Sequence, residues 1–143
     1  MSNDSGGLSG PAAARVRLKV LIVEDHPGTQ QAMRLVLRWL KCSADVADNG
    51  RDALEALRVH AYDIILMDVV MPIMDGLEAT RRIRQERPPG TPPRIVGLSA
   101  DCMLEDRQIC LSAGMDDFLP KPLDIDALAR ILDQTALSLA PVC

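Results

Sequence analysis

Residues 63–67 read DIILM, and residues 20–23 read VLIV. Both runs are almost continuously apolar, whereas a strand with one wet face would alternate apolar and polar residues. Three more β-rich runs lie along the chain: ADVA at 44–47, RIVGL at 94–98 and DDFL at 116–119. Because stretches with helical spacing separate these runs, the sequence predicts an α/β fold with helices on both faces of a parallel sheet.

Spacing and stop signals place a helix after each strand. The first begins after Pro27, where Met33, Val36 and Leu37 share one face. The other four open after Asn49-Gly50, run from Asp75-Gly76 to Pro88, cover 103–113 before Gly114, and follow Asp124. Five βα units predict a doubly wound, five-stranded parallel sheet, (βα)5. Such an open sheet binds its ligands beyond the carboxyl ends of the strands.

The length of 143 residues fits one domain. Residues 1–16 are small, polar and glycine-rich, which predicts a flexible N-terminal segment before a domain at 17–139 and a C-terminal tail at 140–143. Aromatic residues make up 2% of the chain, and 16 basic against 20 acidic residues give a net charge of −4. This composition offers neither a stacking platform nor a basic stripe, so direct binding of nucleic acid is not expected.

The sequence contains no apolar run of about 20 residues and no basic-then-apolar leader. We therefore expect no membrane segment in this chain and a cytoplasmic location. The four cysteines form no C-x-x-C pair, so buried or idle thiols are expected instead of a zinc site. The oligomeric state stays open.

Residues with carboxylate, hydroxyl or ammonium groups follow four of the five strands. They are Glu24 and Asp25, Asp68, Ser99 and Lys121. Carboxylates about 5 Å apart repel by roughly 3 kcal/mol at an effective dielectric near 20, so the cluster should hold a cation or raise a pKa. Oxygen ligands suit Mg²⁺, or Mn²⁺ as a substitute, better than zinc. The alternative for Glu24 and Asp25 is a capping role at the first helix.

Four motifs occur at these strand ends: VLIVED at 20–25, ILMDVVMPIMDG at 65–76, GLSAD at 97–101 and GMDDFLPKPL at 114–123. With these motifs in this order, the chain resembles a response-regulator receiver domain of the two-component and phosphorelay type, from Arg17 to about Leu139. The resemblance implies a flavodoxin-like strand order, 2-1-3-4-5. The residues within these motifs look most like those of receivers from hybrid histidine kinases and phosphorelays.

The resemblance also implies roles for individual residues. Asp68 resembles the phospho-acceptor, the nucleophile that takes a phosphoryl group from a phosphohistidine of a histidine kinase or histidine phosphotransfer protein. Asp25, Asp68 and the backbone carbonyl of Val70 would ligate Mg²⁺ directly. Glu24, longer than the Asp of many relatives, would act through water. Val70 and Asp101 stand where this family tunes dephosphorylation; Val70 cannot orient a water, whereas Asp101 could orient or repel one.

Further expectations concern the phosphoryl group and the switch. Lys121 and Ser99 would each hold a phosphoryl oxygen, and the resemblance implies that the Lys121-Pro122 bond is cis. Phe118 matches an aromatic switch position, where the ring moves inward as the Ser99 hydroxyl shifts toward the phosphoryl group. Static packing of the ring is the alternative.

Other features have plainer interpretations. His26 flanks the acidic pocket, where loop polarity or a modest pH influence is expected, and neither histidine fits a phosphodonor. Four arginines, at positions 81, 82, 84 and 87, are expected on the solvated face of the third helix. Trp39, with Ala32 and Leu35, forms a second apolar stripe on the first helix, either as the edge of the core or as a partner contact.

The predicted function is therefore that of a phosphoryl acceptor with self-catalysed phosphorylation and dephosphorylation, not a separate enzyme. A degenerate receiver that only binds proteins is the main alternative. A Mg²⁺-dependent aspartyl-phosphate phosphatase is disfavoured, because that chemistry needs an Asp two residues after the nucleophile and Val70 stands there. The sequence leaves open a stand-alone regulator, a relay intermediate and a receiver excised from a hybrid kinase.

Overall fold

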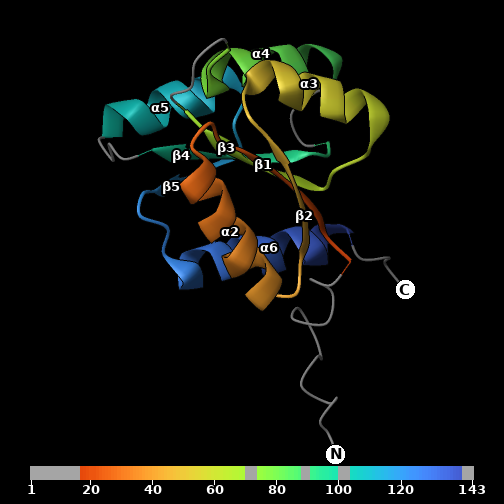
Figure 1. Cartoon of the computed structure of the whole chain (residues 1–143). Coiled ribbons are helices and arrows are strands. Elements are labelled where there is room, and N and C mark those ends of the chain that lie inside the picture. Colours follow the sequence, from red (N-terminus) through yellow and green to blue (C-terminus); the bar gives the residue numbers. More distant parts are fainter. Residues whose placement is uncertain (1–16, 70–73, 88–90, 100–103, 140–143) are drawn as a thin grey trace, which may run out of the picture.

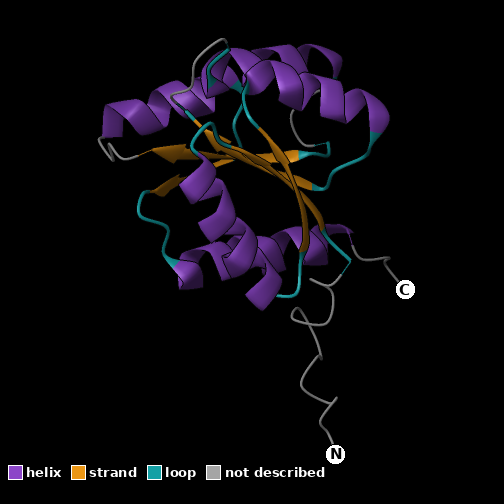
Figure 2. Ribbon diagram, in the orientation of Figure 1, coloured by secondary structure: helices purple, strands orange, loops and turns teal. Residues whose placement is uncertain are grey.

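The computed structural model describes residues 17–69, 74–87, 91–99 and 104–139. In these ranges five strands form one parallel sheet: β1 (Lys19–Val23), β2 (Ser43–Ala47), β3 (Ile64–Asp68), β4 (Arg94–Ser99) and β5 (Asp117–Pro120). Their order is β2-β1-β3-β4-β5, and the sheet lies between two layers of helices (Figure 1, Figure 2). The predicted α/β class, (βα)5 count and 2-1-3-4-5 order are confirmed.

The five helices of the described ranges are α2 (Pro27–Trp39), α3 (Gly50–Val59), α4 (Gly76–Glu86), α5 (Leu104–Ala113) and α6 (Ile125–Leu139). Side-chain caps explain where three of them begin. Asn49 accepts from the amide of Asp52, Asp75 from that of Glu78, and Asp124 from that of Asp126, each at 2.9 Å. After α5, Gly114 has a φ of +113°, a conformation that favours glycine.

The cap of α2 is His26 and not an acidic residue. The Nδ1 atom of His26 accepts a hydrogen bond from the amide of Thr29 at 3.2 Å. Neither Glu24 nor Asp25 is therefore needed as the cap, and both remain available to the acidic pocket. The sequence predicts loop polarity or a modest pH influence for His26, and the structure shows a polar role as the helix cap.

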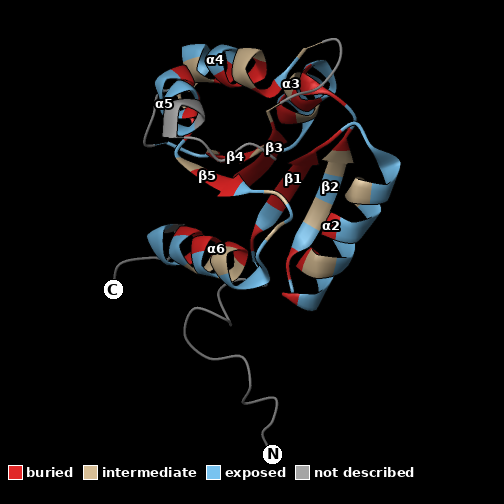
Figure 3. Cartoon of the chain, turned by 90° about the vertical axis from the view of Figure 1, so that its left-hand side faces the viewer, coloured by how far each residue is buried: buried red, intermediate tan, exposed pale blue. Residues whose placement is uncertain are grey.

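The sheet separates two apolar clusters. Figure 3 shows α2 and α6 on one side of the sheet and α3, α4 and α5 on the other. Met33 and Leu37 of α2 pack with Leu128 and Leu132 of α6 on one face. On the other face α3, α4 and α5 contribute Ala53, Leu57, Ala79, Ile83 and Cys110. The strands β1 and β3 lie between both layers, and every residue of β3 is buried, which explains their continuous apolar runs. None of the helices in the described ranges combines the length and apolar character that crossing a bilayer requires.

The expectation of a uniformly solvated arginine face on α4 is wrong at Arg84. Its side chain is 6% exposed, and its Nη2 lies 2.5 Å from Oδ2 of Asp116. Its Nε also donates to the carbonyl of Gly114 at 2.9 Å. In contrast, Arg81 and Arg82 are about half exposed, with side-chain values of 53% each. Arg84 therefore faces the turn between α5 and β5. Arg81 lies one turn earlier on the same side of the helix, but it pairs with Glu78 and stays exposed.

The second apolar stripe of α2 does not join the core. Leu35 is 55% exposed and Trp39 is 71% exposed. Met33 and Leu37 supply the buried face of this helix instead. Of the two interpretations of Trp39, the edge of the core is therefore wrong, and the side chain is exposed to solvent.

Candidate functional site: an acidic cluster at the ends of the strands

Parallel pairing brings the ends of β1 and β3 together. Val23 is the register partner of Met67, so Glu24 and Asp68 follow at the same edge of the sheet. Glu24, Asp25 and Asp68 each offer a carboxylate oxygen, and these atoms lie within 4.8 Å of one another. Glu24 is 2% and Asp68 6% exposed, while Asp25 is exposed. The structure thus places the three predicted carboxylates in one cluster open to solvent on the Asp25 side.

Glu24 is held by hydrogen bonds at both of its carboxylate oxygens. Its Oε2 accepts from the amide of His26 at 3.1 Å, and its Oε1 lies 3.0 Å from Nζ of Lys121. The Gln30 side chain of α2 donates both to the Glu24 carbonyl and to Oδ1 of Asp48. Burial of this carboxylate is therefore compensated by two groups, the His26 amide just before α2 and the Lys121 ammonium just after β5.

Lys121 bridges two of the carboxylates. Its Nζ lies 3.1 Å from Oδ2 of Asp68, besides the contact to Glu24, and its side chain is 27% exposed. Burial acts to lower the pKa of Lys121, but the hydrogen bonds and charges of Glu24 and Asp68 outweigh it, so the pKa is raised above its ordinary value. The Lys121-Pro122 peptide bond is cis.

Ser99 and Phe118 occupy neighbouring strands. Ser99 is the last residue of β4, half-buried, and its carbonyl accepts from the Lys121 amide at 2.8 Å. Phe118 of β5 is the register partner of Gly97 and is 8% exposed within the cluster under α3, α4 and α5. The ring therefore already lies inward. Val70 and Asp101, the predicted tuning positions, lie outside the described residues.

Gln30 and Asp48 also lie beside the cluster, and the sequence patterns did not predict them. Asp48 directly follows β2, so the rule that identified Asp25 and Asp68 could also have found it. Gln30 gives no such signal, because its role depends on the way α2 packs beside the end of β1. The Gln30 amide nitrogen donates to Oδ1 of Asp48 at 2.8 Å, and through Gln30 this pair is connected to the main chain of Glu24.

The residues present fit a divalent cation. Three carboxylates and one ammonium leave two net negative charges in a partly buried site. All candidate side-chain ligands are oxygen atoms, as hard cations such as Mg²⁺ prefer, and the exposed Asp25 side leaves room for coordinated water. Charge and ligand chemistry together therefore favour Mg²⁺ over zinc at this position.

An apolar groove of about 620 Å³ borders the cluster on the side of Lys121. Ala32 and Val36 of α2 line one wall, and Pro122 and Leu123 line the other. His26 and Lys121 belong to both the groove and the surroundings of the acidic cluster. A protein that covers the groove would therefore lie directly beside Asp68.

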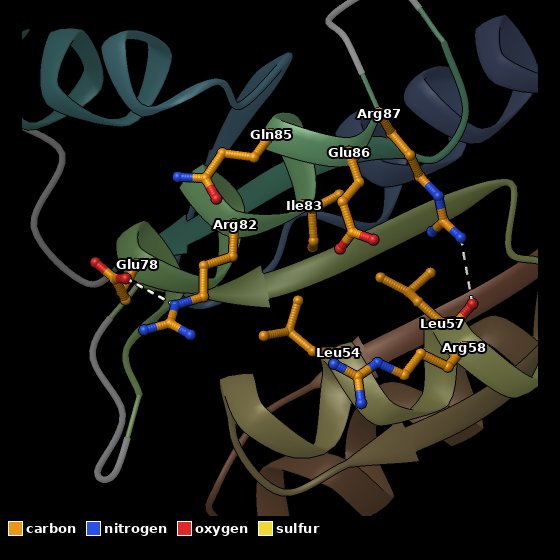
Figure 4. A pocket seen from close by; sticks show the side chains of 9 residues that line it. All are labelled: Leu54, Leu57, Arg58, Glu78, Arg82, Ile83, Gln85, Glu86 and Arg87. Atoms are coloured by element: carbon orange, nitrogen blue, oxygen red, sulfur yellow. Dashed lines mark hydrogen bonds and ion pairs between the residues drawn. The ribbon is translucent and has the colours of Figure 1, made fainter.

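A second groove, of about 330 Å³, lies between α3 and α4 (Figure 4). Its arginines are engaged within the chain: Arg82 donates to Glu78 at 2.9 Å and Arg87 to the Leu57 carbonyl at 3.3 Å, as the dashed lines show. Leu54 and Ile83 supply its apolar surface. Because it contains none of the clustered carboxylates, and because Arg58 and Arg82 already form ion pairs with Glu55 and Glu78, the groove is not the candidate site.

Comparisons with known proteins agree with this geometry. A family model described as the response regulator receiver domain matches residues 20–133. The sensor histidine kinase RcsC of Salmonella typhi is 41% identical over 115 residues, which are 80% of this chain and 12% of that protein. The virulence sensor protein BvgS of Bordetella pertussis is 38% identical over 128 residues, 87% of this chain and 10% of that protein. The chain thus spans about a tenth of the length of these relatives.

Two solved structures are similar over most of the chain. The receiver domain of sensor histidine kinase PA1611 from Pseudomonas aeruginosa, with a magnesium ion coordinated in its active site cleft, has a TM-score of 0.75 and 37% identity, covering 83% of this chain and 97% of that one. The receiver domain of Ssk1 from Saccharomyces cerevisiae, crystallised with the histidine phosphotransfer protein Ypd1, is similar to this chain with a TM-score of 0.79 and 30% identity, at coverages of 87% and 92%. The chain belongs to the response regulator receiver domain family.

Proposed function

We propose that the chain takes a phosphoryl group from a phosphohistidine onto Asp68 in a Mg²⁺-dependent reaction and that the added charge switches a partner-binding surface. The observation that carries the proposal is the position of the Asp68 carboxylate, 3.1 Å from the Lys121 ammonium and clustered with Glu24 and Asp25. In the reaction an Asp68 oxygen bonds to phosphorus, the phosphorus–nitrogen bond breaks, and the imidazole leaves with the electron pair.

Asp25, Asp68 and the backbone carbonyl of Val70 are the proposed direct ligands of Mg²⁺, with Mn²⁺ as a substitute. Glu24 acts through water in this proposal. Its two carboxylate oxygens already accept hydrogen bonds from His26 and Lys121, which supports a position outside the direct ligand set. When bound, the ion would neutralise charge on the transferring group.

Lys121 and Ser99 are the proposed partners of the phosphoryl oxygens. The ammonium already stands beside Asp68, and Ser99 ends the neighbouring strand, with Leu98 as the register partner of Asp68. Positioning and charge neutralisation are the main requirements of phosphoryl transfer, so no further acid or base is invoked. Self-catalysed phosphorylation and dephosphorylation belong to this proposal, and the tuning roles of Val70 and Asp101 stay predictions.

The proposed partner is a histidine kinase or a histidine phosphotransfer protein. A histidine that reaches Asp68 brings its own protein against the apolar groove of Ala32, Val36, Pro122 and Leu123. The Ssk1 receiver, which is similar in structure, was crystallised with a histidine phosphotransfer protein. The position of the groove beside Asp68 supports docking there, and the Ssk1 complex supports this class of partner.

The proposed receiver domain spans residues 17–139, between the segments 1–16 and 140–143. Because RcsC and BvgS are sensor proteins of much greater length, we place this receiver in a hybrid histidine kinase or a phosphorelay. The cytoplasmic location expected from the sequence stays a prediction.

Intact mass after incubation with acetyl phosphate tests the function. The wild-type chain should gain one phosphoryl group with Mg²⁺ and none with a chelator, and Asp68→Ala should gain none. Asp126→Ala, which removes an exposed carboxylate of α6, is the matched control and should label like the wild type. A wild-type chain that never labels would favour the degenerate receiver, and label on Asp68→Ala would contradict the proposed acceptor.

A further inference from the structure

Two backbone hydrogen bonds connect residues that follow Asp68 in the sequence to the first residues of α4 and α3. The amide of Gly76, at the start of α4, donates to the carbonyl of Val69 at 3.0 Å. The amide of Gly50, at the start of α3, donates to the carbonyl of Met74 at 3.1 Å. The first bond closes a loop onto the residue after Asp68, and the second ties that loop to a helix more than 20 residues earlier in the sequence.

Gly76 packs directly against the acceptor. A Cβ atom at this position would overlap the carbonyl oxygen of Asp68 and would lie 2.9 Å from Cγ of Met67. The atom that would have to move is part of the backbone of Asp68 itself. Position 76 therefore determines how closely α4 can approach the residue that carries the carboxylate.

Gly50 makes the matching close approach from α3. A Cβ atom there would lie 2.7 Å from the Met74 carbonyl oxygen and 2.9 Å from Cβ of Ala79. Among the described glycines, only Gly114 has a positive φ, so a special backbone angle does not explain the requirement for glycine at positions 50 and 76. The requirement comes from space: only hydrogen fits between these backbones.

We propose that Gly50 and Gly76 are positioning residues for the acidic cluster, because they hold both ends of the loop so that Asp68 faces Glu24 and Asp25. The inference rests on the proposed function, since the consequence is a preformed site for Mg²⁺. Neither glycine offers a side chain to a ligand, and both act through backbone atoms, Gly76 on Asp68 and Val69 and Gly50 on Met74. Loss of either contact should raise the Kd for Mg²⁺ by more than a substitution that only lowers the stability of the fold.

Titration of the full chain with Mg²⁺ by calorimetry tests the proposal on Gly50→Ala. Displacement of a residue that supports metal ligands typically lowers metal affinity about 10-fold or more, and an increase in Kd of this size is expected. The matched control is Ala53→Gly on the same helix. Ala53 is also buried, but its amide donates a hydrogen bond to the carbonyl of Asn49 in the first turn of the helix and not to the residues after Asp68. This control should lower the melting temperature and leave the Mg²⁺ affinity within about twofold.

Equal Kd values for Gly50→Ala and the wild type would overturn the inference, and so would equal weakening in Gly50→Ala and Ala53→Gly. If Gly50→Ala does not fold, hydrogen exchange of the wild type decides. Saturating Mg²⁺ should slow exchange at the Gly50 and Gly76 amides more than at the Ala53 amide, and an unchanged Gly50 amide would refute the inference. Failure of the wild type to bind Mg²⁺, or binding by Asp68→Asn with wild-type affinity, would instead count against the proposed function.

Discussion

The Nζ atom of Lys121 lies 3.1 Å from Oδ2 of Asp68, although 53 positions separate the two residues in the sequence. The ammonium also contacts Glu24, so it balances part of the charge of two buried carboxylates. A divalent cation would supply the same kind of compensation from the other side of the cluster. Lys121 and a bound metal ion would therefore both offset the negative charge of Glu24 and Asp68.

Lys121→Met should lower the free energy of unfolding by about 3 kcal/mol in the presence of a chelator, because Glu24 and Asp68 then lose their counter-charge. Saturating Mg²⁺ should recover part of this loss, since stabilisation by a bound cation is larger where the uncompensated charge is larger. Urea unfolding with and without Mg²⁺ measures both quantities. Lys19→Met, at the exposed first residue of β1, is the control, and an equal deficit of Lys121→Met in both conditions would contradict the shared balance.

Arg84→Met should be strongly destabilising for a structural reason alone. The guanidinium is 6% exposed, and its partner Asp116 also accepts the amide of Ile95 at 2.8 Å. Removal of one member of such a buried pair typically costs about 3 kcal/mol or more. Arg81→Met, whose ion pair is exposed and 3.7 Å long, should change stability by about 0.5 kcal/mol or less. Similar urea midpoints for the two variants would show that the buried pair contributes little.

Tyr62 provides a pH-dependent test at the opposite end of the sheet. Its hydroxyl donates to Asp45 at 2.6 Å, and burial, followed by the hydrogen bond and the charge of Asp45, raises the pKa of Tyr62 from 10.0 to about 12. A raised folded-state pKa means that the neutral phenol stabilises the fold below pH 10, and that this contribution is lost as the pH rises toward 12. The stability difference between wild type and Tyr62→Phe should therefore be constant below pH 10 and shrink above it.

Absorbance of the phenolate measures this pKa directly, because Tyr62 is the one tyrosine of the chain. Asp45→Ala should lower the midpoint while leaving it above the ordinary value, since burial is the larger cause of the shift. A wild-type midpoint near 10 would mean that the ring is solvated and that the contact to Asp45 does not persist.

Local patterns predicted most of the fold and the acidic cluster. Continuous apolar runs identified β1 and β3, because a strand covered on both faces has no polar alternation. The carboxyl ends of those strands carry Glu24, Asp25 and Asp68. The rule that ligands bind at the strand ends then needed only the strand positions. These features depend on short segments of sequence, and such segments are readable without tertiary structure.

Features that depend on contacts between distant segments could not be predicted. Arg84 has the same residue type as Arg81 and Arg82, and its burial depends on contacts with Gly114 and Asp116, which come 30 and 32 residues later in the sequence. Trp39 was ambiguous for a similar reason, because an apolar stripe on a helix does not reveal whether another element covers it. In this chain the described elements leave its side chain 71% exposed.

The last prediction concerns Phe118, which is the register partner of Gly97, two residues before Ser99 on β4. If phosphorylation draws the Ser99 hydroxyl toward the acceptor, this part of β4 should transmit the shift to the ring. Phe118 is the one phenylalanine of the chain, so selective labelling gives a single ring signal in NMR spectra.

Addition of Mg²⁺ and beryllofluoride, a phosphoryl mimic, should move the Phe118 ring signal in the wild type and move it less in Ser99→Ala, because that variant lacks the hydroxyl that couples the strand to the site. The indole signal of the exposed Trp39 is the internal control and should stay in place. Because the ring is already 8% exposed and packed in the core, a change in its contacts is expected rather than a full swing between solvent and interior. An unchanged signal in the wild type would favour static packing of Phe118, and an equal shift in Ser99→Ala would separate the ring from the hydroxyl.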